Sequence, residues 1–91
     1  MKVTTKSGFK CDINDHILED WRLMAAISDS QADDPKTKMR AAVEMVRLIL
    51  GDSTDSYFDY IAGKNENHIV PEEIVTADIL SIINKIKALK N

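Results

Sequence analysis

The feature that most constrains this chain is the stretch Met39–Leu50, which is apolar on almost every side when wound as an α-helix. At about 100° per residue, one face gathers the apolar residues Met39, Ala42, Val43, Val46, Ile49 and Leu50. A second apolar face carries Ala41, Met45 and Leu48. Such a helix is normally covered on both sides. In a chain of 91 residues, either its own helices or a partner protein must cover the second face.

Length and composition favour one small folded domain spanning residues 1–91. The chain is 44% hydrophobic and 30% charged, a balance typical of folded proteins rather than disordered ones. Its net charge of −3 argues against a nucleic-acid module, which needs a basic patch. The single cysteine, Cys11, is compatible with a reducing cytoplasm. We expect neither a signal peptide nor a membrane span, since the apolar runs are short.

The predicted fold is mainly α, with a short N-terminal β-hairpin over residues 1–13 and a helical part over 14–91. Val3–Thr5 and Phe9–Ile13 alternate with the period of two that is typical of strands, and Gly8 can take the positive φ of the turn between them. We expect the buried face of the hairpin to carry Phe9, Cys11 and Ile13. Because two strands alone are marginal in water, the hairpin must lie against helices or pair with another copy.

About four helices, packed in a small bundle, are expected after the hairpin. The first is predicted to begin at Asn14 or Asp15. One stripe of this helix should face the core, and a smaller apolar pair, Leu23 and Ile27, should lie to one side of that stripe. The residues expected on that inward stripe are Ile17, Leu18, Trp21, Met24, Ala25 and Ser28.

The remaining helices have clear start and stop signals. Asp34-Pro35 predicts the cap and first position of the second helix, which should end at Leu50 before Gly51. A short third helix should begin at Ser53 or Thr54 and end at Gly63, and Pro71–Glu73 should open the last. The last helix has a seam with spacings of three and four, formed by Val75, Ile79, Ile82, Ile86 and Leu89. Ile83 should widen this seam, while Ile74 and Leu80 should project away from it.

Charge alternates in blocks along the chain. Residues 12–34 and 52–78 are acidic, whereas the second helix and the C-terminus are basic. Ordinary solvated faces would explain this pattern, because surface ion pairs contribute little. Complementary surfaces that guide head-to-tail association of identical subunits would explain it too.

No arrangement of residues predicts catalysis, so we expect no enzyme. His16 and His68 lack neighbours that suggest a triad, and Cys11 belongs to a strand pattern. Three scattered Cys and His residues cannot supply a zinc site, and the acidic loops lack the glycine and glutamate of a calcium-binding EF-hand. The three glycines stand apart, without a phosphate-binding loop. No metal and no cofactor are therefore expected.

The order of several short motifs resembles the small tail assembly chaperones of long-tailed bacteriophages and prophages. The motifs are Ser7-Gly8-Phe9, Ile13, Leu18-Glu19-Asp20-Trp21-Arg22-Leu23, Leu48-Ile49-Leu50-Gly51, Tyr57-Phe58 and Val70-Pro71-Glu72-Glu73. The likeness covers nearly the whole chain, although the motifs are diffuse and structural. The sequence departs from the family's pattern in having Arg22 where an acidic residue is expected, and a longer basic lead into the second helix.

The resemblance implies a non-enzymatic protein in the cytoplasm of the infected bacterium, absent from the mature virion. Copies of it would coat the helical tape-measure protein and keep it soluble until tail-tube subunits polymerise around it. In this family a longer product, made by ribosomal frameshifting, is thought to recruit the tube protein, and this chain would be the short form. The implied partners are the tape-measure protein, the tube protein and further copies of the chain, with neither nucleic acid nor membrane.

We expect apolar residues left over after folding to bind a tape-measure helix in a groove. The candidate partner-binding residues are Ala41, Met45, Leu48, Ile74 and Leu80. Methionine suits a surface that must accept different helical segments, because it repacks easily. Two alternatives stay open for Met45 and Leu48: they are held open for a partner, or they are covered by Tyr57, Phe58 and the hairpin. The competing function is a small homo-oligomeric structural or adaptor protein of a prophage, without a chaperone role.

Overall fold

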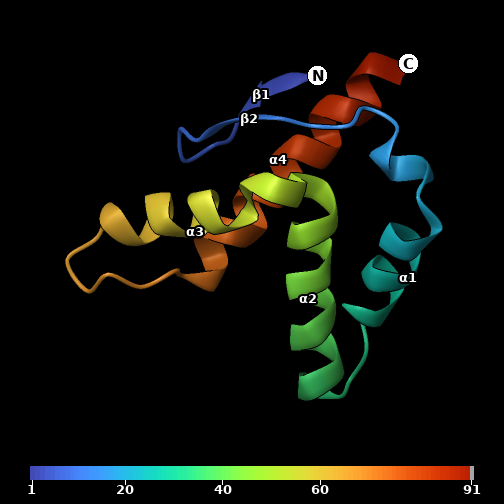
Figure 1. Cartoon of the computed structure of the whole chain (residues 1–91). Coiled ribbons are helices and arrows are strands. Elements are labelled where there is room, and N and C mark those ends of the chain that lie inside the picture. The colour runs from blue at the N-terminus through green and yellow to red at the C-terminus, as the bar shows by residue number, and fades with distance from the viewer. Residues whose placement is uncertain (91) are drawn as a thin grey trace.

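The computed structural model describes residues 1–90, which are mostly helical behind a short N-terminal antiparallel hairpin (Figure 1). The strands are β1 (Lys2–Thr4) and β2 (Lys10–Asp12), and short 3-10 turns occupy Ile17–Glu19 (η1) and Gly51–Ser53 (η2). The α-helices are α1 (Trp21–Asp29), α2 (Pro35–Leu50), α3 (Thr54–Gly63) and α4 (Glu72–Lys90). The expectation of a mainly helical chain with an N-terminal hairpin is confirmed.

The hairpin forms as the alternation predicts. Val3 on β1 pairs with Cys11 on β2 in antiparallel register. Gly8 closes the turn with a φ of 103°, a conformation that favours glycine. Phe9 and Cys11 are half-buried against the core and Ile13 is buried, so the expected inner face is confirmed.

The first helix begins later than predicted. Neither Asn14 nor Asp15 starts it, because the chain first makes η1 and then extends at Asp20, whose ψ is 120°. The Asp20 carboxylate accepts a hydrogen bond from the backbone N–H of Arg22 and also binds the Arg22 guanidinium. These bonds make Asp20 the true N-cap and set the phase of α1 from Trp21 onward.

The ends of α2, α3 and α4 agree with the start and stop signals in the sequence. The Asp34 carboxylate caps α2 by accepting hydrogen bonds from the backbone N–H and hydroxyl of Thr37, and Pro35 follows in the first turn. Gly51 ends α2 with a positive φ. The Ser53 side chain makes no capping bond to α3, whereas the Thr54 hydroxyl donates to the Gly51 carbonyl.

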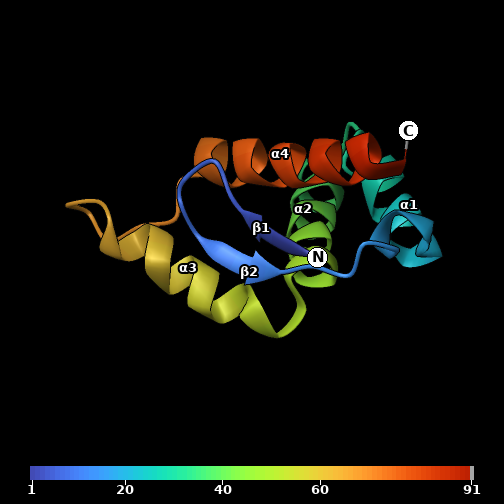
Figure 2. The same ribbon diagram turned by 90° about the horizontal axis from the view of Figure 1, so that it is seen from above.

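The helices do not lie side by side in the expected small bundle. Among residues 1–90, the most extensive helix pair is α1 with α2, which run in opposite directions, while α3 leads away from the upper end of α2 and α4 passes across that end (Figure 1). Seen from above, the hairpin lies across the space between α3 and α4 (Figure 2). The lower half of α2 therefore projects from the rest of the protein, with only α1 alongside it (Figure 1).

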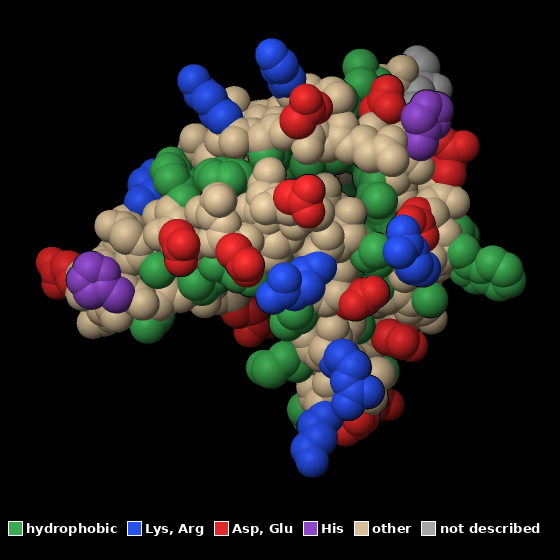
Figure 3. Space-filling model, in the orientation of Figure 1, with side chains coloured by type: hydrophobic (Ala, Val, Ile, Leu, Met, Phe, Trp, Pro, Cys, Tyr) green, Lys and Arg blue, Asp and Glu red, His purple; other side chains and the backbone are tan. Residues whose placement is uncertain are grey.

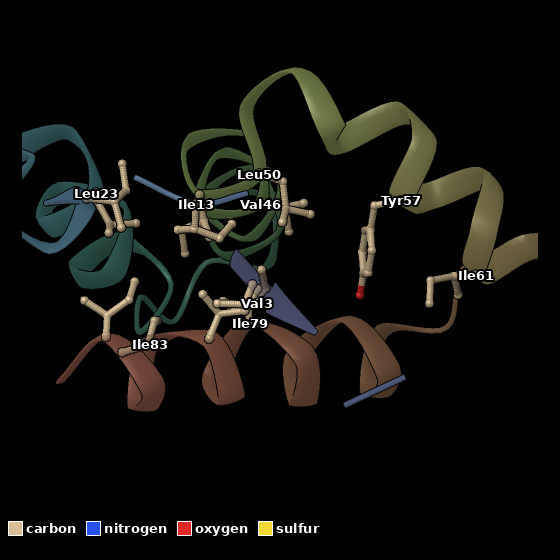
Figure 4. Close-up of a cluster of buried hydrophobic side chains, with 13 residues drawn as sticks. Val3, Ile13, Leu23, Val46, Leu50, Tyr57, Ile61, Ile79 and Ile83 are labelled. Carbon is tan, nitrogen blue, oxygen red and sulfur yellow. The ribbon is translucent and has the colours of Figure 1, made fainter. Parts of the chain in front are cut away.

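The core lies where the hairpin, the C-terminal half of α2, α3 and α4 meet (Figure 4). Val3 and Ile13 enter it from the hairpin, and Tyr57 points from α3 toward α4. Its buried hydrophobic residues are Val3, Ile13, Ile17, Leu23, Val46, Ile49, Leu50, Tyr57, Ile61, Ile79, Ile82, Ile83 and Ile86. The predicted seam of α4 is thus buried in its middle, while its last member, Leu89, is exposed.

Candidate partner-binding surface

Most of the residues predicted to bind a partner are covered by the protein itself. Ala41 is buried, and Met45, Leu48 and Ile74 are half-buried and pack against the core. Only Leu80 is well exposed, on the outer side of α4 beside a shallow hollow that Lys6 and Lys85 help to line. Of the two alternatives for Met45 and Leu48, the structure agrees with cover by the protein itself, because both pack against the core that contains Tyr57 and the hairpin residue Val3. Leu80 alone among the five candidates is exposed.

The reason lies in the packing of α1 against α2. In the lower half of α2, the buried position is Ala41, whose small side chain allows a neighbouring helix to approach closely. Only α1 runs beside that half of the helix, so α1 covers this face (Figure 1). Periodicity could not choose between the faces of α2, because nearly every face is apolar.

An open apolar stripe lies on the opposite side of α2. Met39 is 71% exposed and Val43 is 44% exposed, although the sequence led us to expect the first and last helices to cover the face to which both belong. Each is two residues from Ala41, which places it about 160° around the helix from that buried position. Met39 and Val43, called the open stripe below, line up with Val46 and Leu50 at spacings of four and three. The line of side chains that these four residues form is thus buried at the C-terminal end of α2 and exposed at its N-terminal end.

Basic side chains border the open stripe. Lys36, Arg40 and Arg47 follow it on one side around the helix, and all three are exposed. In the space-filling view, the projecting part of the molecule has hydrophobic side chains along one edge, Lys and Arg side chains beside them, and Asp and Glu side chains toward the other edge (Figure 3). Lys36, Arg40 and Arg47 are called the basic flank below. The open stripe therefore combines apolar contact area with positive charge.

A second apolar surface lies on the outer face of α1. Trp21 is 83% exposed and Met24 is 58% exposed, whereas Leu23 between them is fully buried. The predicted inward stripe of the first helix is therefore wrong at Trp21, Met24, Ala25 and Ser28, all of which are exposed. That stripe was counted continuously from Ile17, but the extended Asp20 interrupts the helix and resets the phase. Leu23 and Ala26 face inward instead.

A buried polar cluster joins the hairpin turn to α3 and α4. The Asp78 carboxylate on α4 is only 1% exposed. Its Oδ1 accepts from the Ser7 backbone N–H at 2.8 Å, and its Oδ2 accepts from the Ser7 hydroxyl at 2.6 Å and the Tyr57 hydroxyl at 2.6 Å. The carbonyl of Ser7 accepts from the Tyr60 hydroxyl and the Lys64 ammonium. Ser7, Tyr57 and Asp78 are called the Asp78 clasp below.

The clasp is suited to holding the turn in place rather than to catalysis. All three bonds run from neutral donors to the carboxylate, and no histidine contacts the Ser7 hydroxyl to take its proton. Burial, together with the hydrogen bond to Asp78, raises the pKa of Tyr57 well above its usual value, so its hydroxyl remains a donor. The sequence offered one signal for Asp78: an acid at the spacing of the apolar seam, between Val75 and Ile82.

The other polar candidates lie apart from one another. His16 is exposed beside Glu19, and His68 lies in the loop before α4 with a φ of 54°. Burial raises the pKa of the Cys11 thiol, which keeps it protonated at neutral pH. Among residues 1–90, no three His, Cys, Asp or Glu side chains come together in a way that could hold a metal ion. Within the same range, no helix is both long and apolar enough to cross a membrane.

Comparison of the chain with protein-family models, with curated proteins and with solved structures found no match.

Proposed function

We propose that this chain is a non-enzymatic phage tail assembly chaperone, which binds helical segments of the tape-measure protein in the bacterial cytoplasm. The sequence resemblance gives this identity, and the open stripe supports a binding role. Apolar side chains scattered over a surface are ordinary. Met39 and Val43 differ because they continue a buried line of the same helix outward.

The open stripe carries the proposal. A partner helix laid along it would bury Met39 and Val43, at a gain of roughly 25 cal/mol for each Å² of apolar surface removed from water. The flexible thioether of Met39 adapts to different side chains, as a chaperone for a long protein requires. Helix-in-groove recognition of this kind uses anchors spaced by three or four residues, which matches the spacing of the stripe.

The test is copurification with the tape-measure protein encoded in the same genome. The double variant Met39→Asp with Val43→Asp should lose the partner, because two carboxylates would have to be buried in the contact. The control is Leu89→Asp, which places the same charge at an exposed leucine of α4. Circular dichroism and urea unfolding check that each variant is folded. A folded double variant that still copurifies with the tape-measure protein contradicts the proposal.

Leu80 is the one exposed residue among the five that the sequence predicted to bind a partner, and its role is tested separately. A Leu80→Asp variant that lowers the yield of tape-measure protein would extend the binding surface to the outer side of α4. A variant that binds as the parent does would exclude Leu80 from the binding surface.

A second candidate function is a self-associating adaptor, which one observation favours. Ile69 and Val70 are exposed in the loop before α4 and are bordered by Glu66, Glu72 and Glu73. This acidic apolar patch is opposite in charge to the open stripe and its basic flank. Contact between the two patches on different copies would be heterologous, and would produce rings or open filaments. Size-exclusion chromatography with light scattering separates the candidates: a lone monomer excludes the adaptor, whereas oligomers dispersed by Val70→Asp support it.

A further inference from the structure

We propose that the open stripe selects an acidic amphipathic helix, one whose apolar anchors are bordered by Asp or Glu. This inference rests on the proposed function, since it specifies the partner chemistry at the same surface. Two observations lead to it: the position of cations around the stripe, and the contrast between α2 and the acidic segments that precede and follow it in the sequence.

The basic flank lies where the side chains of a docked helix would reach. With the centre of the stripe set at 0°, Lys36, Arg47 and Arg40 fall at about 40°, 60° and 80° around α2. Lys38 falls at about 120° on the opposite side, beyond Ala42, too far around the helix to border the stripe. Along the axis, the cations extend from residue 36 to residue 47, about 16 Å at the helical rise per residue. Charges at these positions meet the residues that border the anchors of a helical ligand.

The only acid on α2 points elsewhere. Glu44 falls at about 120° from the stripe, and its charge acts on Arg22 of α1. In the part of the chain that the structure describes, Lys36 and Arg40 form no ion pair within 4 Å, although the charge of Arg40 acts on the Asp34 carboxylate, and Arg47 forms only a 3.9 Å contact with Asp55. The basic flank is therefore available to a ligand.

The flank also contrasts with the segments next to α2 in the sequence. Residues 12–34 and 52–78 are acidic, whereas α2 carries four cations and one acid. An acidic ligand would therefore be repelled by these two segments and attracted to α2. Such charge complementarity guides association and excludes wrong partners more than it adds affinity.

A helix fits the length of this surface better than the acidic loop of a second copy does. Ile69 and Val70 are adjacent residues, so they cover about one turn of α2. The stripe and its flank extend over three turns. A ligand helix would place its apolar anchors on the turn between Met39 and Val43 and its acidic side chains along the cations of the adjoining turns.

The experiment uses the full chain and two synthetic peptides of about three heptads. Both have leucine at the a and d positions; the first has glutamate and the second has lysine at the positions that border them. Fluorescence anisotropy of labelled peptide measures binding. The acidic peptide should bind at least about tenfold more tightly at about 0.05 M salt, and the difference should shrink at about 0.5 M because salt screens exposed charges. The double variant Lys36→Glu with Arg40→Glu should reverse the preference, whereas Lys87→Glu on α4 should leave it unchanged.

Each remaining outcome contradicts the inference in a distinct way. Equal binding of both peptides overturns the charge selection and leaves the proposed helix binding intact. Binding of neither peptide overturns the inference, while copurification with the tape-measure protein still decides the proposed function independently. If the charge-reversed variant instead loses self-association of the parent chain, the stripe belongs to a second copy.

Discussion

The hydroxyl of Tyr57 donates a 2.6 Å hydrogen bond to Oδ2 of Asp78, linking α3 to α4 inside the protein. The same oxygen accepts from the Ser7 hydroxyl, so one buried carboxylate fixes three elements that lie far apart in the sequence. Replacing Asp78 with alanine should lower the free energy of unfolding by about 3 kcal/mol, because the Ser7 and Tyr57 donors would be left buried without an acceptor. Urea denaturation measures the change.

Asp59→Ala is the matched control for this variant, since Asp59 is an exposed acid of α3. Its free energy of unfolding should stay within about 0.5 kcal/mol of the parent. A loss below about 1 kcal/mol in Asp78→Ala would mean that the clasp contributes little to stability.

The raised pKa of Tyr57 predicts a loss of stability in alkali. The folded protein holds the phenol proton more tightly than the unfolded chain, whose tyrosines titrate near pH 10. The stability that the protonated Tyr57 hydroxyl contributes is fully present below about pH 10, and it is lost as the pH rises toward the pKa of Tyr57 in the folded protein. In Tyr57→Phe the free energy of unfolding should be lower by about 1–2 kcal/mol at neutral pH. It should also fall less steeply than in the parent above pH 10. If the free energy of unfolding fell equally steeply with pH in Tyr57→Phe and in the parent, Tyr57 would not be the group that causes the loss of stability in alkali.

Gly8 tests the fit of the hairpin turn against α3. Its φ is positive, and a Cβ at this position would lie 2.8 Å from the Tyr60 hydroxyl. Gly8→Ala should therefore destabilise the protein by about 2 kcal/mol in urea unfolding. Gly63→Ala is the control, because an added Cβ there meets nothing within 4 Å and alanine is the better helix former. Equal stabilities of the two variants would argue against the close packing of the turn.

Two adjacent residues of α1 test which side of the helix faces inward. Leu23→Ala should lower the free energy of unfolding by about 2–5 kcal/mol, because it leaves a cavity in the core. Met24→Ala should change it by about 0.5 kcal/mol at most, since that side chain is mostly in water. Thermal or urea unfolding of both variants measures these changes. A larger loss of stability for Met24→Ala than for Leu23→Ala would mean that Met24, and not Leu23, faces the core.

These two residues also mark the limit of what the sequence alone could predict. Local signals were sufficient where a single residue sets the backbone conformation at the end of a helix. Asp34 and Gly51 are examples, because α2 begins and ends at them as expected. The phase of α1 could not be predicted in the same way. It depends on the extension at Asp20, where the Arg22 guanidinium and backbone hold the carboxylate, and this break separates Ile17 from Trp21.

The candidate surface was misplaced for a related reason. Hydrophobic residues surround α2, so the pattern identified a surplus of apolar surface but not the side that α1 would take. The small Ala41 lies toward α1, and Met39 is left in water. The Asp78 clasp escaped prediction because its partners, Ser7 and Tyr57, become neighbours only after the hairpin has docked.

The Ser7–Asp78 contact also has a consequence for the order of folding. These residues are separated by 71 positions, and most of the helical part of the chain lies between them. During synthesis the turn leaves the ribosome early, whereas its carboxylate acceptor follows only with α4. Until then Val3 and Ile13 have no α4 to pack on, so the hairpin, which is made before the helices, is among the last of these elements to reach its final place. Contacts of such long sequence separation slow folding, and they leave apolar hairpin residues exposed in the nascent chain.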